Sequence, residues 1–324
     1  MKFNGFIAAI FVAIIIAYLF PEGIVLFPLK TITDIGIGFI FFFYGLKLSP
    51  AEFKLGFLNY KVHIAIQLAT FVAFPLLALL CLPLFEAGTG SDLWIALFFL
   101  GTLPSTVSSS IVMVSLAKGN LPTAIFNASL SGLIGIFATP IWLSFFLSGS
   151  TDFEFLDVLI KLCWQIIIPL ILGLFLQKFL GDFARKHSKK LGLLDKTTII
   201  LIVYSSFSNS FTSNIFSSVE TFDLLKLTGI VILLFFIVYF GLGLICNILG
   251  FNLKDKITTQ FCGTKKSLVH GSVMVKVIFG NSANTGLLLL PIMIYHSLQL
   301  ILIAFYAENY RKRVLKAETP EETL

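Results

Sequence analysis

Long apolar runs, repeated along almost the whole chain, are the feature that most constrains its fold. The first of them, GFIAAIFVAIIIAYLF, begins shortly after Lys2. Of the 324 residues, 57% are hydrophobic and only 12% are charged, and the mean hydropathy is +0.96. Soluble globular domains carry roughly 25% charged residues, about twice this share. Runs of this length and number predict an all-α protein that crosses a lipid bilayer many times.

Breaks rich in charged residues, proline or glycine divide the sequence into ten predicted transmembrane segments. They cover residues 5–20, 35–46, 62–85, 93–115, 121–148, 162–177, 197–217, 228–250, 255–280 and 285–307. We expect the first segment to be a retained helix, because no small-residue cleavage pattern follows it. The ninth segment is the most irregular, since Lys265, Lys266, His270 and Lys276 interrupt it.

Basic residues are distributed unevenly between the two sides that ten segments define. With ten segments both termini share one side, and 17 of the 23 lysines and arginines fall there. The opposite side holds only Lys30, Lys161 and Lys226, and the other three lie within the ninth segment. Because cytoplasmic loops carry such an excess, we expect both termini in the cytoplasm and the chain in the plasma (inner) membrane. The basic excess then reflects topology, so we expect the lipid bilayer as a partner and no nucleic acid.

A short motif recurs half a chain length apart. VMVSLAKGN covers residues 112–120 and VMVKVIFGN covers residues 273–281, in a chain of 324. Each copy lies in the fourth segment of a five-segment half, and because five is odd the halves would have opposite orientations. We predict two inverted five-helix repeats, residues 1–152 and 153–310, and a cytoplasmic tail at residues 311–324. The alternative is a chance similarity between two apolar segments.

Both copies of the motif follow features that interrupt a helix. The fourth segment contains Pro104 within the hydroxyl-rich stretch PSTVSSS, and the ninth contains Gly271 beside its lysines. Proline removes a backbone donor, and serine and threonine hydroxyls compete for backbone hydrogen bonds. Transporters with inverted repeats place their sites at such interruptions. Ser108, Ser109 and Ser110 are therefore candidate ligands, and hydrogen bonding within their own helix is the alternative.

Three sequence stretches carry a family resemblance. LAKGN follows the end of the fourth segment, KKSLVHGSVMVKVIFGN lies at the end of the ninth, and PIMIYHSLQL lies within the tenth. With the inverted plan they resemble the bile acid:sodium symporter family, and more closely its orphan branch that includes member seven of solute carrier family 10. The resemblance covers essentially the whole chain. It implies a core domain (segments three to five and eight to ten), a panel domain (one, two, six and seven), and broken fourth and ninth helices that cross.

The resemblance also implies sodium-coupled transport of organic anions such as bile acids, and it indicates candidate ion ligands. Gln67 matches a polar ligand of the third segment, and Ser110 matches the serine of a Ser-Asn pair whose asparagine is Ile111 here. In the fifth segment, Asn127 and Ser131 lie close to the positions of two further ligands. We take Gln67, Ser110 and Ser131 as candidate ion ligands and Asn127 as a candidate substrate ligand.

Other ligands of the family are missing. Two hydroxyl ligands of the fifth segment correspond to Ala124 and Ala128, and the acidic ligand of the ninth corresponds to His270. A hard cation prefers oxygen ligands, preferably with one of them anionic. We therefore predict weak sodium affinity, or coupling to protons or to no ion, and we expect no other cofactor and no metal centre. His270 is a candidate for proton coupling, with a neutral, hydrogen-bonded histidine as the alternative.

Polar residues also occur in the seventh and ninth segments. YSSFSNSFTSN (residues 204–214) surrounds its helix with polar positions, so protein or water must border it, and Asn209 and Asn214 are candidate substrate ligands. Lysines at membrane depth cost roughly 2.5–3.5 kcal/mol each. We expect Lys265 to reach the cytoplasmic surface. Lys276 lies deeper, and no acidic residue of the other predicted segments is available to it, so we expect it to contact an anionic solute.

These observations together predict a secondary active transporter of an organic, anionic solute that works by alternating access as a monomer or homodimer. A non-transporting regulator or receptor that keeps the same fold is the alternative, because ion ligands are missing. We do not expect an enzyme, since no acidic residue is placed to orient His270 toward a serine nucleophile. The predicted solute contacts are Ser108, Ser109, Asn127, Asn209, Asn214, His270 and Lys276, and the predicted ion contacts are Gln67, Ser110, Ser131 and His270.

Overall fold

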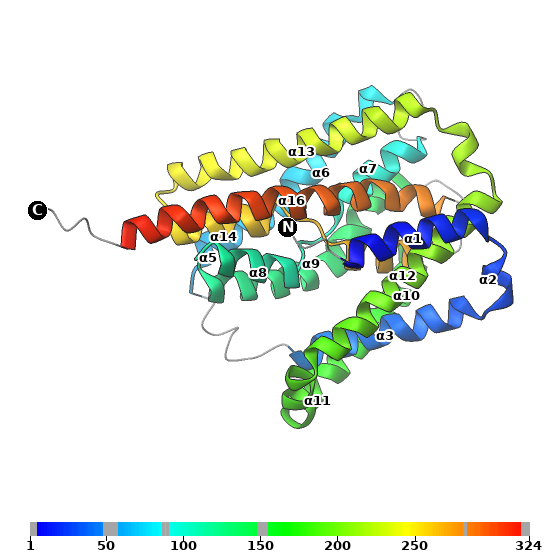
Figure 1. The fold of residues 1–324 in the computed structure, drawn as a ribbon, viewed down its shortest axis with the longest axis horizontal. Coiled ribbons are helices and arrows are strands. Elements are labelled where there is room, and N and C mark those ends of the chain that lie inside the picture. Colours follow the sequence, from blue (N-terminus) through cyan, green and yellow to red (C-terminus); the bar gives the residue numbers. More distant parts are fainter. Residues whose placement is uncertain are drawn as a thin grey trace, which may run out of the picture.

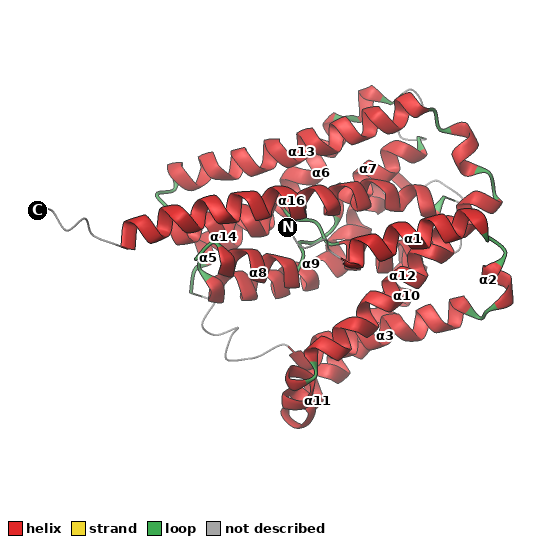
Figure 2. Cartoon of the chain, viewed as in Figure 1, coloured by secondary structure: helices red, strands yellow, loops and turns green. Residues whose placement is uncertain are grey.

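The structure is a computed structural model, which describes residues 5–47, 58–85, 88, 91–147, 155–280 and 284–318. Within these ranges the chain forms helices joined by turns and short loops, and no residue lies in a β-strand (Figure 2). In a bilayer the α-helix satisfies every backbone group within one segment, which a lone strand cannot do. The predicted all-α fold is confirmed.

The helices of the first half of the chain follow the apolar runs. They are α1 (Gly5–Leu19), α2 (Gly23–Leu26), α3 (Leu29–Lys47), α5 (Tyr60–Leu68), α6 (Phe74–Leu80), α7 (Asp92–Thr102), α8 (Ser108–Leu116) and α9 (Leu121–Leu147). A π-helical turn, η1 (Ala69–Ala73), joins α5 to α6, and a 3₁₀ turn, η2 (Leu82–Leu84), follows α6.

The second half of the chain has the same character. Its helices are α10 (Phe155–Leu162), α11 (Ile168–Lys186), α12 (Ser188–Thr212), α13 (Thr221–Ile248), α14 (Leu253–Thr264), α15 (Leu268–Met274) and α16 (Thr285–Glu318). Two π-helical turns, η4 (Cys163–Ile167) and η6 (Val275–Phe279), and a 3₁₀ turn, η5 (Ile215–Ser218), continue or follow these helices.

Seven helical segments of the described chain are long and apolar enough to cross a membrane. They cover residues 29–47, 60–84, 121–146, 156–186, 188–212, 221–248 and 285–315. These correspond to every predicted segment except the first, the fourth and the ninth. A span needs about 20 residues, whereas α1 has 15 and the longest helix in the fourth or ninth segment has 12. A multi-pass membrane protein is confirmed, and the number of ten stays a prediction.

Pro75 interrupts the backbone hydrogen bonding of the third predicted segment, and a side chain of another helix replaces the missing donor. Pro75 has no backbone N–H, so the carbonyl oxygen of Phe71, four residues earlier, loses its helical partner. The indole N–H of Trp142, on α9, donates to this oxygen at 2.8 Å. The π-helical turn η1 lies directly before the proline and accommodates the shift. The interruption therefore ties the third predicted segment to the fifth.

The helices pack in two groups. α1, α3, α11 and α12 contact one another, with α3 along α11 and α1 along α12. α13 packs against α14 and α16, and α16 also packs against α7. In Figure 1, α3 and α11 lie below α13 and α16. α12 joins the groups, because it also contacts α15 and α16.

Two glycines let α3 and α11 approach each other closely. A Cβ atom added to Gly173 of α11 would lie 3.1 Å from Cα of Gly45 in α3, and it would also meet the backbone oxygen of Phe42. Small residues are common where membrane helices touch, because they let two backbones come together. This contact positions α3 against α11.

Candidate functional site

The fourth predicted segment is divided into two helices. α7 ends at Thr102 and α8 begins at Ser108. Leu103 has an extended backbone, with φ −68° and ψ 150°. Pro104 explains this end, because a proline disfavours the helical conformation of the residue before it and cannot donate to the helix.

The ninth predicted segment is divided in the same way. α14 ends at Thr264, and Lys265 has an extended backbone with φ −78° and ψ 148°. α15 begins after Ser267, whose hydroxyl accepts a hydrogen bond from the backbone N–H of His270 at 3.2 Å. A serine in this position stabilises a new helix start.

The two non-helical segments, residues 103–107 and 265–267, contact each other, and we call them together the junction. The backbone N–H of Ser267 donates to the backbone oxygen of Pro104 at 2.9 Å. The hydroxyl of Ser105 donates to the backbone oxygen of Cys262, in the last turns of α14, at 2.6 Å. Segments more than 150 residues apart in sequence thus satisfy each other's backbone groups.

Every backbone carbonyl from Phe99 to Pro104 has a donor. The last carbonyls of a helix have no partner within it, so inside a membrane they need donors from elsewhere. The carbonyl of Phe99 accepts from the Thr102 hydroxyl, that of Leu100 from the Leu103 N–H, and that of Gly101 from the Lys266 ammonium. The carbonyl of Thr102 accepts from the Thr139 hydroxyl, that of Leu103 from the Lys266 ammonium, and that of Pro104 from the Ser267 N–H. The end of α7 is held by tertiary contacts.

Lys266 is buried in the junction. Its ammonium donates to the backbone oxygens of Thr70 at 2.8 Å, Gly101 at 2.6 Å and Leu103 at 2.7 Å. The same nitrogen lies 4.3 Å from the centre of the Phe74 ring. Three hydrogen bonds and an aromatic face replace the water that this charge loses.

Gln299 of α16 holds the backbone of Lys266. Its amide oxygen accepts from the Lys266 N–H at 2.8 Å, and its amide nitrogen donates to the Lys266 backbone oxygen at 2.9 Å. The side chains of Gln299 and His296 also bond to each other at 2.9 Å. The amide thereby substitutes for the helical partners that Lys266 lacks.

Lys265 does not reach the surface, so the expectation that it extends to the cytoplasmic side is wrong. Its side chain is buried, and its ammonium donates to the backbone oxygen of Ser109 at 2.7 Å. The hydroxyl of Thr106 lies 2.9 Å from those of Ser109 and Ser110. The junction turns Lys265 inward, where the backbone oxygen and hydroxyl of Ser109 replace water.

Among the predicted site residues, Gln67 and Asn127 meet. The Gln67 amide donates to the Asn127 side-chain oxygen at 3.1 Å. The Asn127 amide donates to the Thr123 backbone oxygen at 3.0 Å and lies 2.6 Å from Nδ1 of His63. Oε1 of Gln67 is buried and has no hydrogen-bond partner among the described residues.

Asn127→Leu tests this polar contact. We expect it to lower the free energy of unfolding by about 1–3 kcal/mol, because the buried Gln67 amide loses its acceptor. The change is measured as a lower melting temperature in detergent. Asn309→Leu, at an exposed position on α16, is the control and should stay within about 0.5 kcal/mol of the parent. Equal melting of the two variants would show that the contact contributes nothing.

His270 and Ser131 lie at the junction. Nδ1 of His270 bonds to the Ser267 hydroxyl at 2.9 Å, and the Ser131 hydroxyl accepts from the Ser105 N–H at 2.9 Å. A Cβ atom added to Gly132, beside Ser131, would lie 3.2 Å from Nε2 of His270. That Nε2 atom has no hydrogen-bond partner among the described residues.

The remaining predicted residues are more dispersed. The side chain of Ser108 lies outside what the structure describes. Asn209 is half-buried on α12, and Asn214 is exposed beyond its end, in the left-handed conformation with φ 53°. Ser210, between them, accepts from the N–H of Gly286 at 3.0 Å, so part of this polar stretch packs against α16.

Lys276 has an acidic neighbour that the predicted segments did not include. It lies buried in η6, and Asp34 of α3 is close enough to attract it electrostatically. The predicted second segment starts at residue 35, whereas α3 begins at Leu29 and includes Asp34. The boundary placed from hydropathy therefore excluded the compensating carboxylate.

The structure adds residues that the sequence reasoning did not select as a site. Lys265, Lys266 and Gln299 hold or line the junction, together with Ser105 and Thr106. The sequence did indicate that Lys265 and Lys266 need partners, because two adjacent lysines within a membrane segment are costly unless they are hydrogen-bonded. Their acceptors are backbone carbonyls, which no side-chain pattern reveals.

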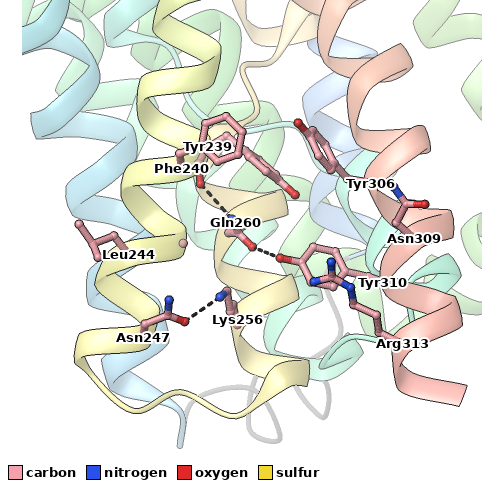
Figure 3. A pocket seen from close by; sticks show the side chains of 11 residues that line it. Tyr239, Phe240, Leu244, Asn247, Lys256, Gln260, Tyr306, Asn309, Tyr310 and Arg313 are labelled. Carbon is pink, nitrogen blue, oxygen red and sulfur yellow. Dashed lines mark hydrogen bonds between the residues drawn. The ribbon is translucent and has the colours of Figure 1, made fainter. Parts of the chain in front are cut away.

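A cavity of about 440 Å³ lies away from the junction, between α13, α14 and α16 (Figure 3). Gln260 lies buried at its base, where it donates to the Tyr239 backbone oxygen at 3.0 Å and accepts from the Tyr310 hydroxyl at 2.6 Å. None of the predicted site residues lines it.

Comparison with known proteins decides the family. The profile of the SBF-like CPA transporter family matches residues 4–312. The chain belongs to this family. The match extends over the junction and both halves of the chain, and it confirms the resemblance to bile acid:sodium symporters. Because this is a family of transporters, the expectation that the chain is not an enzyme is also confirmed.

Relatives of the SBF-like CPA transporter family align over nearly the full length. PA2026 of Pseudomonas aeruginosa, described as uncharacterized, is 34% identical over 96% of this chain and 93% of its own length. YfeH of Escherichia coli K12 is 30% identical, over 99% and 96% of the two chains. Sodium/bile acid cotransporter 7 of Rattus norvegicus is 31% identical, over 92% and 89%.

Proposed function

We propose that the chain is a secondary transporter that moves an organic anion across the membrane by alternating access. The observation that carries this proposal is the junction, where interrupted helices from the two halves of the chain bond to each other. Inverted-repeat transporters bind their substrates at interrupted helices near the middle of the bilayer. Short helix ends and freed backbone groups at such a point can bind a polar solute and release it.

The recurrence of the interruption in each half supports an inverted repeat. α7 and α8 flank residues 103–107, and α14 and α15 flank residues 265–267. If each pair crosses the bilayer together, these are the fourth and ninth of ten segments, within repeats 1–152 and 153–310. α1, α3 and α12 would form the panel together with the continuous helix of α10, η4 and α11, and segments three to five and eight to ten would form the core. Movement between panel and core would open the junction to each side in turn.

Lys265 supports an anionic solute. Lys266 already donates to three carbonyls, whereas Lys265 has one short bond, to Ser109, and lies 3.5 Å from the Ser109 hydroxyl. No ion pair found among the described residues involves either lysine. The Lys265 ammonium therefore retains a hydrogen for an anion, and a carboxylate or sulfonate would compensate its charge.

Sodium is the coupling ion that the relatives named sodium/bile acid cotransporter favour, and a proton is the alternative. Gln67 and His270 each present a buried polar atom without a partner among the described residues, as an ion ligand would. Their set contains no carboxylate, so we propose weak sodium binding. The basic excess supports an inner-membrane location with both termini cytoplasmic, as a monomer or homodimer.

The test of transport is uptake of labelled organic anions into liposomes that contain the purified protein. We expect uptake above that of protein-free liposomes, driven by a sodium gradient or a proton gradient. His270→Ala should flatten the dependence on pH between about pH 5.5 and pH 8 if protons are coupled. If no member of a broad panel of bile-acid-like and smaller anions is taken up under any gradient, the proposal is wrong and a non-transporting role follows.

Lys265→Gln tests the proposed charge selectivity. We expect it to reduce uptake of an anion roughly tenfold, which corresponds to about 1.4 kcal/mol of lost binding, because the fixed positive charge is removed. Lys189→Gln, at an exposed position of α12, is the matched control and should leave uptake unchanged. Initial rates at several solute concentrations make the comparison. An equal rate for the two variants would exclude Lys265 as the anion contact.

A further inference from the structure

The bonding of Lys266 defines a site for a cation. Three backbone oxygens, of Thr70, Gly101 and Leu103, lie 2.6–2.8 Å from one nitrogen. An ammonium has three N–H bonds and can satisfy three acceptors, whereas a neutral amine has only two. The geometry is therefore that of a charged ammonium with all of its hydrogens in use.

The three oxygens are suited to a cation for reasons that do not depend on lysine. Gly101 and Leu103 lie at the carboxyl end of α7, where unpaired carbonyls carry partial negative charge. Thr70 contributes its carbonyl from η1, and the Phe74 ring faces the same point. Carbonyl oxygens gathered in this way also hold potassium ions in channel filters.

We propose that Lys266 is a tethered cation, whose ammonium permanently fills a monovalent-cation site formed by the carbonyls of Thr70, Gly101 and Leu103. Since this cation is covalently attached, it is not released during a transport cycle. A coupling ion, where one is used, binds elsewhere. The ammonium compensates the partial negative charge at the carboxyl end of α7, so this end needs no free cation.

Removing the side chain should open the site to free ions. Lys266→Ala is purified in sodium chloride and in choline chloride of equal concentration, and its melting temperature is measured as each of sodium, potassium and methylammonium is added. We expect a lower melting temperature than the parent in choline, and a saturable rise with one or more of the small cations. The rise should exceed any that the parent and Lys190→Ala, a variant at an exposed position of α12, show with the same cation, because a coupling ion bound elsewhere would stabilise all three proteins. An unchanged melting temperature of Lys266→Ala in all four cations would overturn the proposal.

Lys266→Met keeps the experiment decisive if the alanine variant does not fold. Methionine fills the same space without charge, so we expect a lower melting temperature than the parent in every cation and no larger rise with sodium than the parent shows. Sodium-dependent stabilisation of the parent that Lys266→Met abolishes would mean that a free ion binds here, and would overturn the proposal. So would parent-like melting of Lys266→Met. These readouts require no transport, so they stand apart from the uptake experiments.

A second inference comes from the cavity between α13, α14 and α16. Lys256 and Arg313 lie toward one end of this cavity, and Tyr239 and Phe240 lie toward the other (Figure 3). The described residues that line it include no aspartate or glutamate. The side chains of Phe240 and Leu244 are 58% and 61% exposed on α13, on a face that a bilayer would cover.

We infer that this cavity binds the headgroup of an anionic phospholipid. The two cationic side chains suit a phosphate, and the exposed apolar side chains of α13 suit the acyl chains that are attached to it. A free anion would satisfy only the first of these features. Basic pockets between membrane helices commonly bind anionic lipid headgroups on the cytoplasmic side, which is the side we expect for Lys256 and Arg313.

Thermal melting in mixed micelles tests this site. Phosphatidylglycerol should raise the melting temperature of the parent more than phosphatidylcholine does, and inorganic phosphate should have no effect. The double variant Lys256→Gln, Arg313→Gln should lose the difference between the lipids, whereas Lys189→Gln, Lys190→Gln should keep it. Equal effects of the two lipids on the parent, or a difference that the first double variant keeps, would overturn the inference. Stabilisation by inorganic phosphate equal to that by phosphatidylglycerol would also overturn it.

Discussion

Gly173→Ala is expected to destabilise the protein by about 3 kcal/mol or more, at the upper end of what an overpacked site costs. The added methyl group would lie 3.0 Å from the backbone nitrogen of Leu46 and 3.1 Å from Cα of Gly45. These are backbone atoms, so no side-chain rotation can relieve the contact. α3 and α11 would have to separate along their shared face.

The expected loss of stability in Gly173→Ala is opposite to the usual effect of this substitution. Glycine to alanine within a helix normally stabilises by up to about 1 kcal/mol. Gly241→Ala, in α13, provides that case, because nothing lies within 4 Å of its added methyl group. Melting temperature and yield of folded protein are compared for the two variants. If Gly173→Ala melts as high as Gly241→Ala, the close contact between α3 and α11 is absent.

Gln299→Leu is expected to cost about 2–6 kcal/mol, because two buried backbone groups lose their partners at about 1–3 kcal/mol each. Both belong to Lys266, whose N–H donates to this amide and whose carbonyl accepts from it. Leucine has nearly the same volume, so the loss reports hydrogen bonding more than packing. The junction is the part of the molecule that should loosen.

Two measurements separate a local effect from general unfolding. Hydrogen exchange at the amides around Lys266 should accelerate in Gln299→Leu, together with a fall in melting temperature. Ser297→Ala is the control on the same helix, because among the described residues the Ser297 hydroxyl bonds only to the backbone oxygen of Met293, in its own helix. Its effect should stay within about 0.5 kcal/mol. Exchange at Lys266 that is equal in the two variants would refute the supporting role of Gln299.

Much of the architecture could be predicted from local signals. Apolar runs located the helices, and α7 ends two residues before Pro104. These signals act through a few neighbouring residues, because a missing N–H or a run of apolar side chains has its effect within one or two helical turns. Helix boundaries were less well predicted. The predicted second segment began at residue 35, whereas α3 begins at Leu29, so the prediction left out Asp34, the acidic neighbour of Lys276.

The candidate site was predicted less completely. The sequence led to Gln67, Asn127, Ser131 and His270, each of which the structure joins to another polar group. The hydrogen bonds that these residues make in the described structure do not link Gln67 and Asn127 with His270, so their sharing one site stays a prediction. Lys265 was expected at the surface and is buried.

The sequence by itself determined that this chain is helical and crosses a membrane, because hydropathy is a local property. Only the tertiary structure decided what happens to the charges of the ninth segment. The acceptors of Lys266 lie 163 to 196 residues away from it along the chain. They are backbone carbonyls, which every residue carries and no residue type marks. Folding alone selects which of them are left without a helical partner and brings the ammonium to them.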